Sequence, residues 1–372
     1  MVGIEVPLIL TGVAAASVAV ASSARSTAPY AFLMAKARAW EARMLGDGKI
    51  ESMADSSSLE SLLSGLRGTD YEPGLEGIEQ DAWALESALS GHLLGVYREV
   101  LSLVPQRGVP FMRKFAERLE LGNLKLVIQA VSGLADRELA LGNLTDGLVF
   151  SKDRLEVMAR SENVEALVEQ LSETDYYGEM SKYLEPGDYE PLDLMRAVEH
   201  GFYTSLWKRT RDLGRKNGKV AQGIIGREID LANVKLIFRL KSAGVGPDVI
   251  LKNLIPVEGE LTIELLRLCA QSDSLDGVRN VLSASPLKSA IVPLMSAAGD
   301  DVGELERLLD ESLTNYCKVV SLFKPLTIAT PLSYLYQKHV EVRNVRTLVR
   351  GIADGFTPED IRKILMRSAR VE

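Results

Sequence analysis

The sequence predicts an all-α fold made of three copies of one helical unit. From Tyr30 onward, apolar residues recur at intervals of three and four, and strict alternation of the kind that marks strands is scarce. A short motif centred on an asparagine occurs three times, at Asn123, Asn233 and Asn344, with spacings of 110 and 111 residues. That period is the length of a small domain, which is longer than a solenoid repeat.

Composition supports a packed protein. The chain has 372 residues, of which 46% are hydrophobic and 25% charged, and these proportions are typical of folded domains. Its net charge of −8 argues against nucleic acid as a partner, because binding to phosphate backbones needs an excess of Lys and Arg. Cys269 and Cys317 lie too far apart for a zinc motif and predict no disulfide framework.

Clusters of Gly, Pro, Ser and Asp predict where the helices are interrupted. They lie at residues 46–58, 68–77, 176–191 and 284–301. Between these breaks each unit reads as a helix, a turn and a helical hairpin whose second helix carries the asparagine.

In all three copies, an aromatic residue on the first hairpin helix lies at nearly the same distance in sequence before the asparagine. Tyr97, Trp207 and Tyr316 precede the asparagines by 26, 26 and 28 residues. We therefore predict an apolar N-terminal extension followed by three similar domains, with the boundaries 1–29, 30–145, 146–252 and 253–372.

The repeated motif reads acid, aliphatic, any residue, Asn, aliphatic, base. On a helix its aliphatic positions form one stripe, which predicts a face toward a core. The acid and the asparagine lie three residues apart at the edge of this stripe, where both reach a common neighbour. We interpret them as buried polar pairs that satisfy an adjacent helix or loop; a catalytic or metal site is disfavoured, because nothing nearby supplies a nucleophile or an open metal position. The pairs are Glu120 with Asn123, Asp230 with Asn233, and Glu341 with Asn344.

Basic residues occupy a second face of the same helices. Two readings stay open for this face, a solvated surface and a contact with a partner. The candidates for partner contact are Lys235, Arg239, Arg346 and Arg350. Residues 208–219 carry six basic residues and one acid, a pattern typical of a solvated helix end and loop.

The sequence contains only incomplete versions of catalytic motifs. Residues 214–220 resemble a phosphate-binding loop, but one residue is missing between the glycines and Val220 replaces the Ser or Thr that would bind Mg²⁺. The three histidines show no metal-binding spacing, and no G-x-S-x-G element occurs. These failures predict a non-catalytic protein without cofactor, metal or small-molecule substrate.

Three stretches carry a family resemblance. They are residues 30–39 (YAFLMAKARA), residues 226–233 (GREIDLAN) followed by Arg239 and Lys241, and residues 339–346 (HVEVRNVR). Together with the 110-residue period, they resemble the C subunit of the archaeal and bacterial A/V-type rotary ATPases, whose eukaryotic counterpart is the d subunit of the vacuolar ATPase. Gln129 departs from the pattern, since the other copies have Arg239 and Arg350.

The resemblance implies three helical domains around a pseudo-three-fold axis, shaped like a funnel. It also implies a place at the cytoplasmic face of the membrane, on the rotor ring of proteolipid subunits, with the tip of the central axle, built from the D and F subunits, received in the funnel. The implied function is to transmit torque between ion translocation, of protons or sodium, and ATP synthesis or hydrolysis. Two alternatives remain: a helical scaffold of another multi-subunit assembly, and a helical enzyme, which would need a polar, concave pocket with perturbed titratable groups.

Residues 6–24 form a run of 19 residues without charge, ahead of the region that resembles the family. As a helix the run would span roughly 28 Å, about one hydrocarbon thickness. A secretory signal is disfavoured because no basic region precedes it. Two alternatives remain, a helix docked on the protein body and a membrane-associated anchor that enters the ring's opening or the adjacent lipid.

Overall fold

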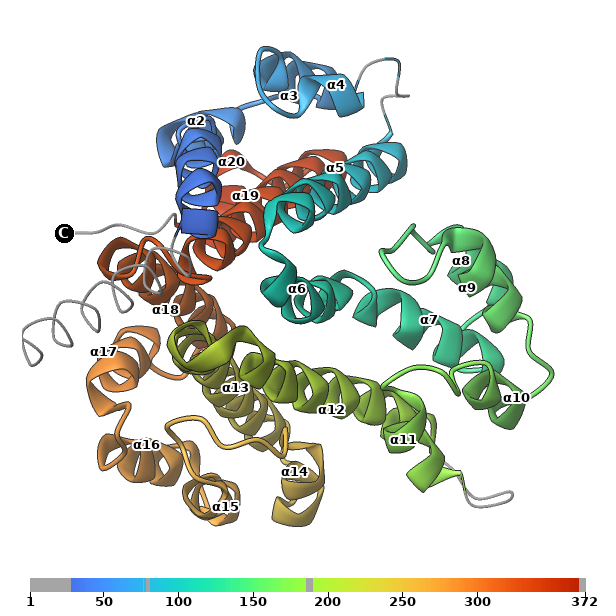
Figure 1. Cartoon of the computed structure of the whole chain (residues 1–372), viewed down its shortest axis with the longest axis vertical. Coiled ribbons are helices and arrows are strands. Elements are labelled where there is room, and N and C mark those ends of the chain that lie inside the picture. The colour runs from blue at the N-terminus through green and yellow to red at the C-terminus, as the bar shows by residue number, and fades with distance from the viewer. Residues whose placement is uncertain (1–27, 76, 78–80, 185–189, 368–372) are drawn as a thin grey trace, which may run out of the picture.

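The computed structural model describes residues 28–75, 77, 81–184 and 190–367. Every regular element in these residues is a helix, which confirms the all-α prediction. Each copy of the repeat contributes several short helices and one long hairpin (Figure 1).

Each copy contains a helical hairpin whose second arm carries the repeated asparagine. The first hairpin is α5 (Ala82–Leu103) with η1 (Gln106–Gly108), α6 (Val109–Ala116), η2 (Glu117–Leu119) and α7 (Leu121–Val131). The second is α12 (Pro191–Arg209) with η4 (Thr210–Leu213) and α13 (Gly214–Ser242). The third is α18 (Val302–Phe323) with α19 (Ala329–Ala353).

Short helices precede each hairpin. The first group is a helix over residues 28–41, α2 (Asp47–Met53), α3 (Leu59–Leu66) and α4 (Glu72–Leu75). The second is α8 (Arg137–Gly142), α9 (Lys152–Ala159), α10 (Val164–Glu169), α11 (Tyr177–Met180) and η3 (Ser181–Tyr183). The third is α14 (Pro247–Asn253), α15 (Ile263–Gln271), α16 (Leu275–Ser283) and α17 (Lys288–Ala298), and α20 (Pro358–Ile364) follows the last hairpin.

Equivalent helices begin with equivalent caps. The side chains of Ser58, Asn163 and Ser274 accept a hydrogen bond from the backbone N–H three residues later, at the start of α3, α10 and α16. Such a bond satisfies one of the free N–H groups of a helix start. The same local signal therefore sets the same helix start in all three copies.

Each asparagine helix also ends in the same way. Gly133, Gly244 and Gly355 follow α7, α13 and α19 with φ of 73°, 72° and 75°. The residue after each glycine donates its N–H to the carbonyl five residues earlier, as from Leu134 to Gln129 at 2.9 Å. This left-handed ending suits glycine, which has no Cβ to clash.

The aliphatic stripe of the repeated motif faces the core, as predicted. Leu124, Val234 and Val345 are each at most 1% exposed. Their partners on the stripe are buried or half-buried and join one continuous core. Burying such side chains stabilises the fold by about 1.5–3 kcal/mol each.

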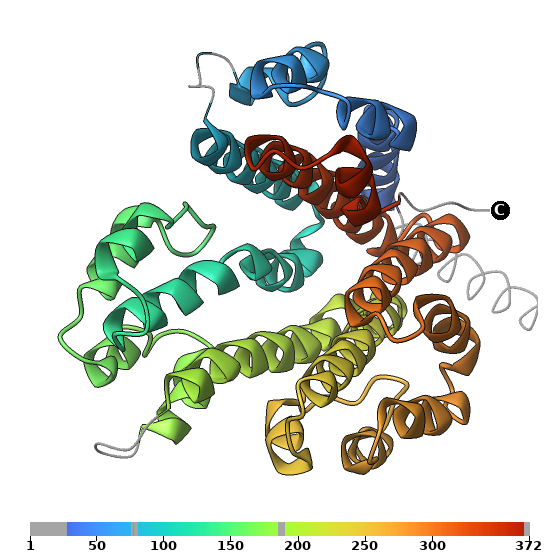
Figure 2. The same cartoon turned by 180° about the vertical axis from the view of Figure 1, so that it is seen from behind.

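The asparagine helix of one copy packs on the first hairpin helix of the next. Helix α7 lies against α12, α13 against α18, and α19 against α5, so the last copy meets the first (Figures 1 and 2). The short helices fill the space beside each pair: α7 contacts α8, α9 and α10, whereas α13 contacts α14, α15 and α16. In space, α7 and α13 thus pack on the first hairpin helix of the copy that follows, whereas α19 packs on both α18 and α5. The domain boundaries at 145/146 and 252/253 stay a prediction.

Among the described residues, no helix is both long and apolar enough to cross a membrane. The predicted apolar segment 6–24 lies outside the described residues.

Candidate coupling site at the centre of the molecule

The three repeated asparagines make the same contact. Each side chain amide bonds the backbone of the residue 22 positions later: Asn123 bonds Thr145, Asn233 bonds Ile255, and Asn344 bonds Met366. In every case the amide NH₂ donates to the carbonyl and the amide oxygen accepts from the N–H, at distances of 2.7–3.2 Å. Because each asparagine both donates to and accepts from one backbone residue, it fixes the loop after its helix.

The repeated acids hold backbone as well. Glu120 accepts the N–H groups of residues 148, 149 and 150, and Asp230 accepts those of 260 and 261. Burial raises the pKa of Glu120 to about 7 and that of Asp230 to about 6, although the N–H groups act in the opposite direction. A glycine lies against each carboxylate, at Gly147 and Gly259, where a Cβ would come within 2.7 Å and 2.5 Å of the acid.

Glu341 in the third copy has different partners. Its carboxylate accepts the Leu45 N–H at 2.7 Å and the Tyr71 hydroxyl at 2.6 Å, and it pairs with the buried Lys338 at 2.6 Å. Burial and the neighbouring Glu341 carboxylate raise the pKa of Tyr71 far above its ordinary value. This acid therefore ties the first short helices to α19.

The predicted basic face bridges neighbouring copies. Lys235 pairs with Asp310, and Arg239 forms two parallel bonds of 2.8 Å with Glu306, both across the contact between α13 and α18. Arg350 pairs with Glu86 and Arg346 donates to Ser90 at 2.6 Å, both across the contact between α19 and α5. Each of the four candidates thus has an intramolecular partner, and contact with another protein of an assembly stays a prediction.

In the first copy, the contact between α7 and α12 is equivalent, but one of its bonds is weaker. Gln129 stands where the other copies have arginine, and its amide contacts the sulfur of Met195 at 3.6 Å. Lys125 pairs with Glu199 as Lys235 does with Asp310. The departure at Gln129 therefore removes one ion pair from the contact between α7 and α12.

A polar cluster joins all three copies at the centre of the molecule. The guanidinium of Arg118 in η2 bonds Glu228 of α13 at 3.2 Å, and Glu228 also accepts the hydroxyl of Tyr336 from α19. The Arg118 guanidinium lies 3.6 Å from the ring centroid of Phe115. Burial and the Glu228 charge raise the pKa of Tyr336 well above its ordinary value.

Sequence reasoning missed this cluster, although a signal for it exists. Arg118, Glu228 and His339 each stand five residues before a repeated asparagine. Because their side chains differ in charge and shape, a search for similar residues passes over them. Aligning the three copies further toward the N-terminus would have shown that one equivalent position holds an arginine, a glutamate and a histidine.

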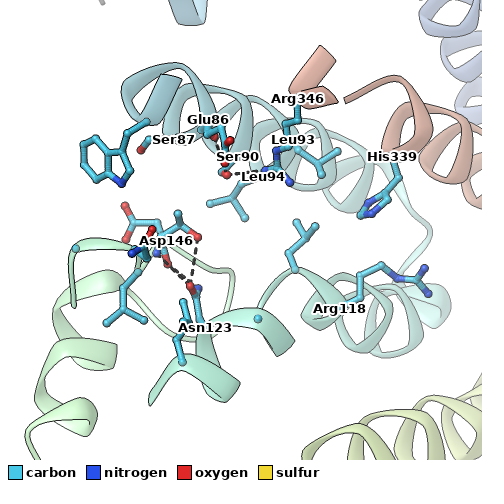
Figure 3. A pocket seen from close by; sticks show the side chains of 18 of the residues that line it. Glu86, Ser87, Ser90, Leu93, Leu94, Arg118, Asn123, Asp146, His339 and Arg346 are labelled. Carbon is cyan, nitrogen blue, oxygen red and sulfur yellow. Dashed lines mark hydrogen bonds between the residues drawn. The ribbon is translucent and has the colours of Figure 1, made fainter. Parts of the chain in front are cut away.

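Two cavities open beside the cluster. One of about 500 Å³ lies between α5, α7, the loop before α9 and α19, and Arg118, His339 and Arg346 line it together with Asn123 (Figure 3). A smaller one of about 190 Å³ shares Arg118 and His339 with it. The surrounding protein and the charges of nearby arginines lower the pKa of His339, so this imidazole is neutral near pH 7.

The rejected motifs are structural in the folded chain. Residues 214–220 open helix α13, and both cysteines are buried and free. Within the part of the chain that the structure describes, no three His, Cys, Asp or Glu side chains gather as metal ligands would. At the centre of the molecule, the charged and aromatic side chains of Arg118, Glu228 and Tyr336 are bonded to one another.

Comparison with known families agrees with the repeat pattern. Residues 33–364 match the sequence profile of the ATP synthase (C/AC39) subunit. The chain belongs to this family. It is 27% identical to the C subunit of the A-type ATP synthase of Thermococcus kodakarensis over 338 residues, with 91% of this chain and 90% of the relative covered. It is 26% identical to the same protein of Methanocaldococcus jannaschii over 356 residues, with coverage of 91% and 86%.

This C/AC39 family membership accounts for the ordered motifs along nearly the whole chain. The equivalent protein from Thermococcus onnurineus, also from an A-type ATP synthase, is 25% identical over 341 residues and likewise covers 91% of this chain. At 25% identity the family assignment depends on the length of the alignment, because isolated short motifs would not align over 91% of this chain.

Proposed function

We propose that this chain is a non-catalytic central-stalk component of an A/V-type ATP synthase, at the cytoplasmic face of the membrane. It links the membrane rotor ring to the D and F subunits of the axle and transmits torque between ion translocation and ATP synthesis or hydrolysis. The observation that carries the proposal is the family match over residues 33–364.

Part of this proposal is that the three copies surround a pseudo-three-fold axis in a funnel-like body. The equivalent asparagine bonds and the closed order of helix contacts, α7 on α12, α13 on α18 and α19 on α5, support it. A linear array of repeats would leave α19 without a neighbour in the first copy. A closed ring of copies resists twisting better than an open array, because no terminal copy can peel away.

The axle contact is proposed at the central cavity and the basic face around it. Arg346 lines the larger cavity, and Arg350 lines the same cavity close to Glu86. Charged rims act mainly on association rate and salt dependence. Acidic or polar groups on the axle would find these guanidinium groups already oriented by their bonds to α5.

The test is to assemble the membrane complex with and without this chain and to measure ATP hydrolysis and ATP-driven ion pumping. Without the chain we expect hydrolysis by the catalytic head to continue while pumping is lost, and adding the purified chain should restore pumping. Restoration by the Arg346→Glu variant should be weaker than by the Arg267→Glu variant, which changes an exposed residue of α15. Pumping that is independent of the chain would contradict the proposal.

A further inference from the structure

The turns of the three long hairpins lie close to one another, and the first described helix begins beside them. We call this surface the turn face. In Figure 1 α6, the junction of α12 with α13, and α18 come together near the centre of the molecule. The turn face comprises residues 28–40, 104–113, 208–219 and 318–328.

Direct contacts hold these four segments together. They are the bond from Arg107 Nε to the Asp212 carbonyl (3.0 Å), the bond from the Ile328 N–H to Asn217 Oδ1 (2.9 Å), the bond from Arg38 to the Ser321 hydroxyl (3.1 Å), and the approach of Tyr30 and Leu213 to Gly108. The four segments are therefore neighbours in the fold although they are far apart in sequence.

The turn face is strongly basic on an acidic protein. Its segments carry twelve Lys and Arg residues and one acid, Asp212, whereas the rest of the chain carries 31 basic and 50 acidic residues. One of the twelve, Arg38, pairs with Glu41 at the end of the same helix at 2.6 Å. The six basic residues of 208–219 are all exposed. The one acid of this segment, Asp212, pairs with Arg209 at 3.7 Å. The segment therefore has a net positive charge.

Large apolar side chains stand among these charges. Phe323, the last residue of α18, is 82% exposed, and Leu322 beside it is 46% exposed. Phe32, near the start of the first described helix, is 59% exposed. Phe323 is the most exposed of the large apolar side chains in the part of the chain that the structure describes.

We propose that the turn face binds the surface of an anionic lipid bilayer. Lys and Arg residues near such a surface each strengthen binding by about fivefold, and exposed aromatic and aliphatic side chains gain by entering the boundary between headgroups and acyl chains. The combination of basic residues with protruding Phe323 and Phe32 favours lipid over a purely polar acidic protein surface. This binding is a property of the chain alone and does not rest on the proposed role in the rotor.

The test uses the purified full chain and vesicles of phosphatidylcholine with or without about one third phosphatidylglycerol. We expect binding to the anionic vesicles that weakens as salt rises, because salt screens surface charge. The variant Arg211→Glu, Arg215→Glu, Lys216→Glu should bind at least about tenfold more weakly. A matched control, Arg137→Glu, Lys252→Glu, Arg267→Glu, changes the net charge equally on exposed positions of α8, α14 and α15 and should keep binding much closer to that of the unmodified chain.

A second variant separates the apolar contribution. Phe323→Ser should reduce vesicle binding while leaving its salt dependence unchanged, because it removes no charge. Equal loss in the two charge variants would overturn the proposal, as would absence of a preference for anionic vesicles. Binding to the protein rotor ring without any binding to vesicles would assign the face to an acidic protein surface and would also overturn it.

Discussion

At the residue scale, buried amides and carboxylates hold loops to helices. Asn233 is fully buried and satisfies both the N–H and the C=O of Ile255. Removing one partner of a buried hydrogen bond leaves the other without water or protein to bond, which costs about 1–3 kcal/mol per group. The repeated asparagine therefore contributes to stability through the backbone that it satisfies.

We predict that Asn233→Ala lowers the free energy of unfolding by about 2–4 kcal/mol. Asn123→Ala should cost less, because Thr145 is half-buried and water can replace part of the bond. Asn143→Ala is the control: its amide bonds an exposed carbonyl, so a loss below about 1 kcal/mol is expected. Denaturant titration followed by circular dichroism measures all three, and an equal cost for Asn233 and Asn143 would contradict the assigned role.

The raised pKa of Glu120 predicts a pH effect. The folded chain holds this proton up to about pH 7, whereas an unfolded glutamate releases it near 4.5, so the stability linked to protonation is present at low pH and is lost as pH rises through 7. Relative to the Glu120→Gln variant, the unmodified chain should therefore lose up to about 3 kcal/mol of unfolding free energy between pH 5 and pH 8. Unfolding curves at several pH values check this, and a constant difference would show that the folded pKa is not raised.

At the element scale, glycines show which helices fit tightly against loops. Gly122 lies in the first turn of α7 with open space around its Cα, whereas a Cβ at Gly259 would meet the Asp230 carboxylate at 2.5 Å and the Gly226 carbonyl at 2.6 Å. The first glycine costs helix stability without a packing reason, and the second allows a loop to reach the acid.

We predict opposite effects from the same substitution at these two positions. Gly122→Ala should raise the free energy of unfolding by about 0.5–1 kcal/mol, because alanine restricts the unfolded chain. Gly259→Ala should lower it by about 1–3 kcal/mol, because the loop must move and Asp230 loses its bonds. Melting temperatures in one buffer compare the two variants, and a stabilised Gly259→Ala would refute the close approach.

Ion pairs across copies give a second prediction at this scale. Arg239→Glu alone should destabilise the chain by about 1 kcal/mol, and adding Glu306→Arg should recover most of the loss. If Arg239 also contacts the axle, as we propose, the double variant should regain stability and still show an altered salt dependence of axle binding. If the double variant regained both its stability and the original salt dependence of axle binding, Arg239 would act only within the chain.

The sequence was sufficient for the elements and their repetition, because caps, helix-ending glycines and the aliphatic stripe are local signals. It was insufficient for two features that depend on distant contacts. The packing of each asparagine helix on the next copy depends on contacts between distant residues, 75 apart for Lys235 and Asp310 and 264 apart for Arg350 and Glu86. The central cluster joins Arg118 and Glu228, which occupy the same position of the repeat, five residues before an asparagine, but whose opposite charges conceal this equivalence.

At the scale of the whole molecule, the three copies close on themselves through α19 and α5, and two cavities open beside the charged cluster where the copies meet. The closing contact combines Arg346 with Ser90 and Arg350 with Glu86. We propose that the centre receives the axle while the turn face points toward the membrane.

The most direct test is a cryo-electron microscopy structure of the assembled ATP synthase that contains this chain. We predict that the chain lies between the rotor ring and the axle, with axle density against the wall formed by Arg118, His339 and Arg346 and with the turn face toward the ring and its lipid. A chain bound at the periphery of the complex, or an empty centre with the axle on another surface, would contradict this prediction.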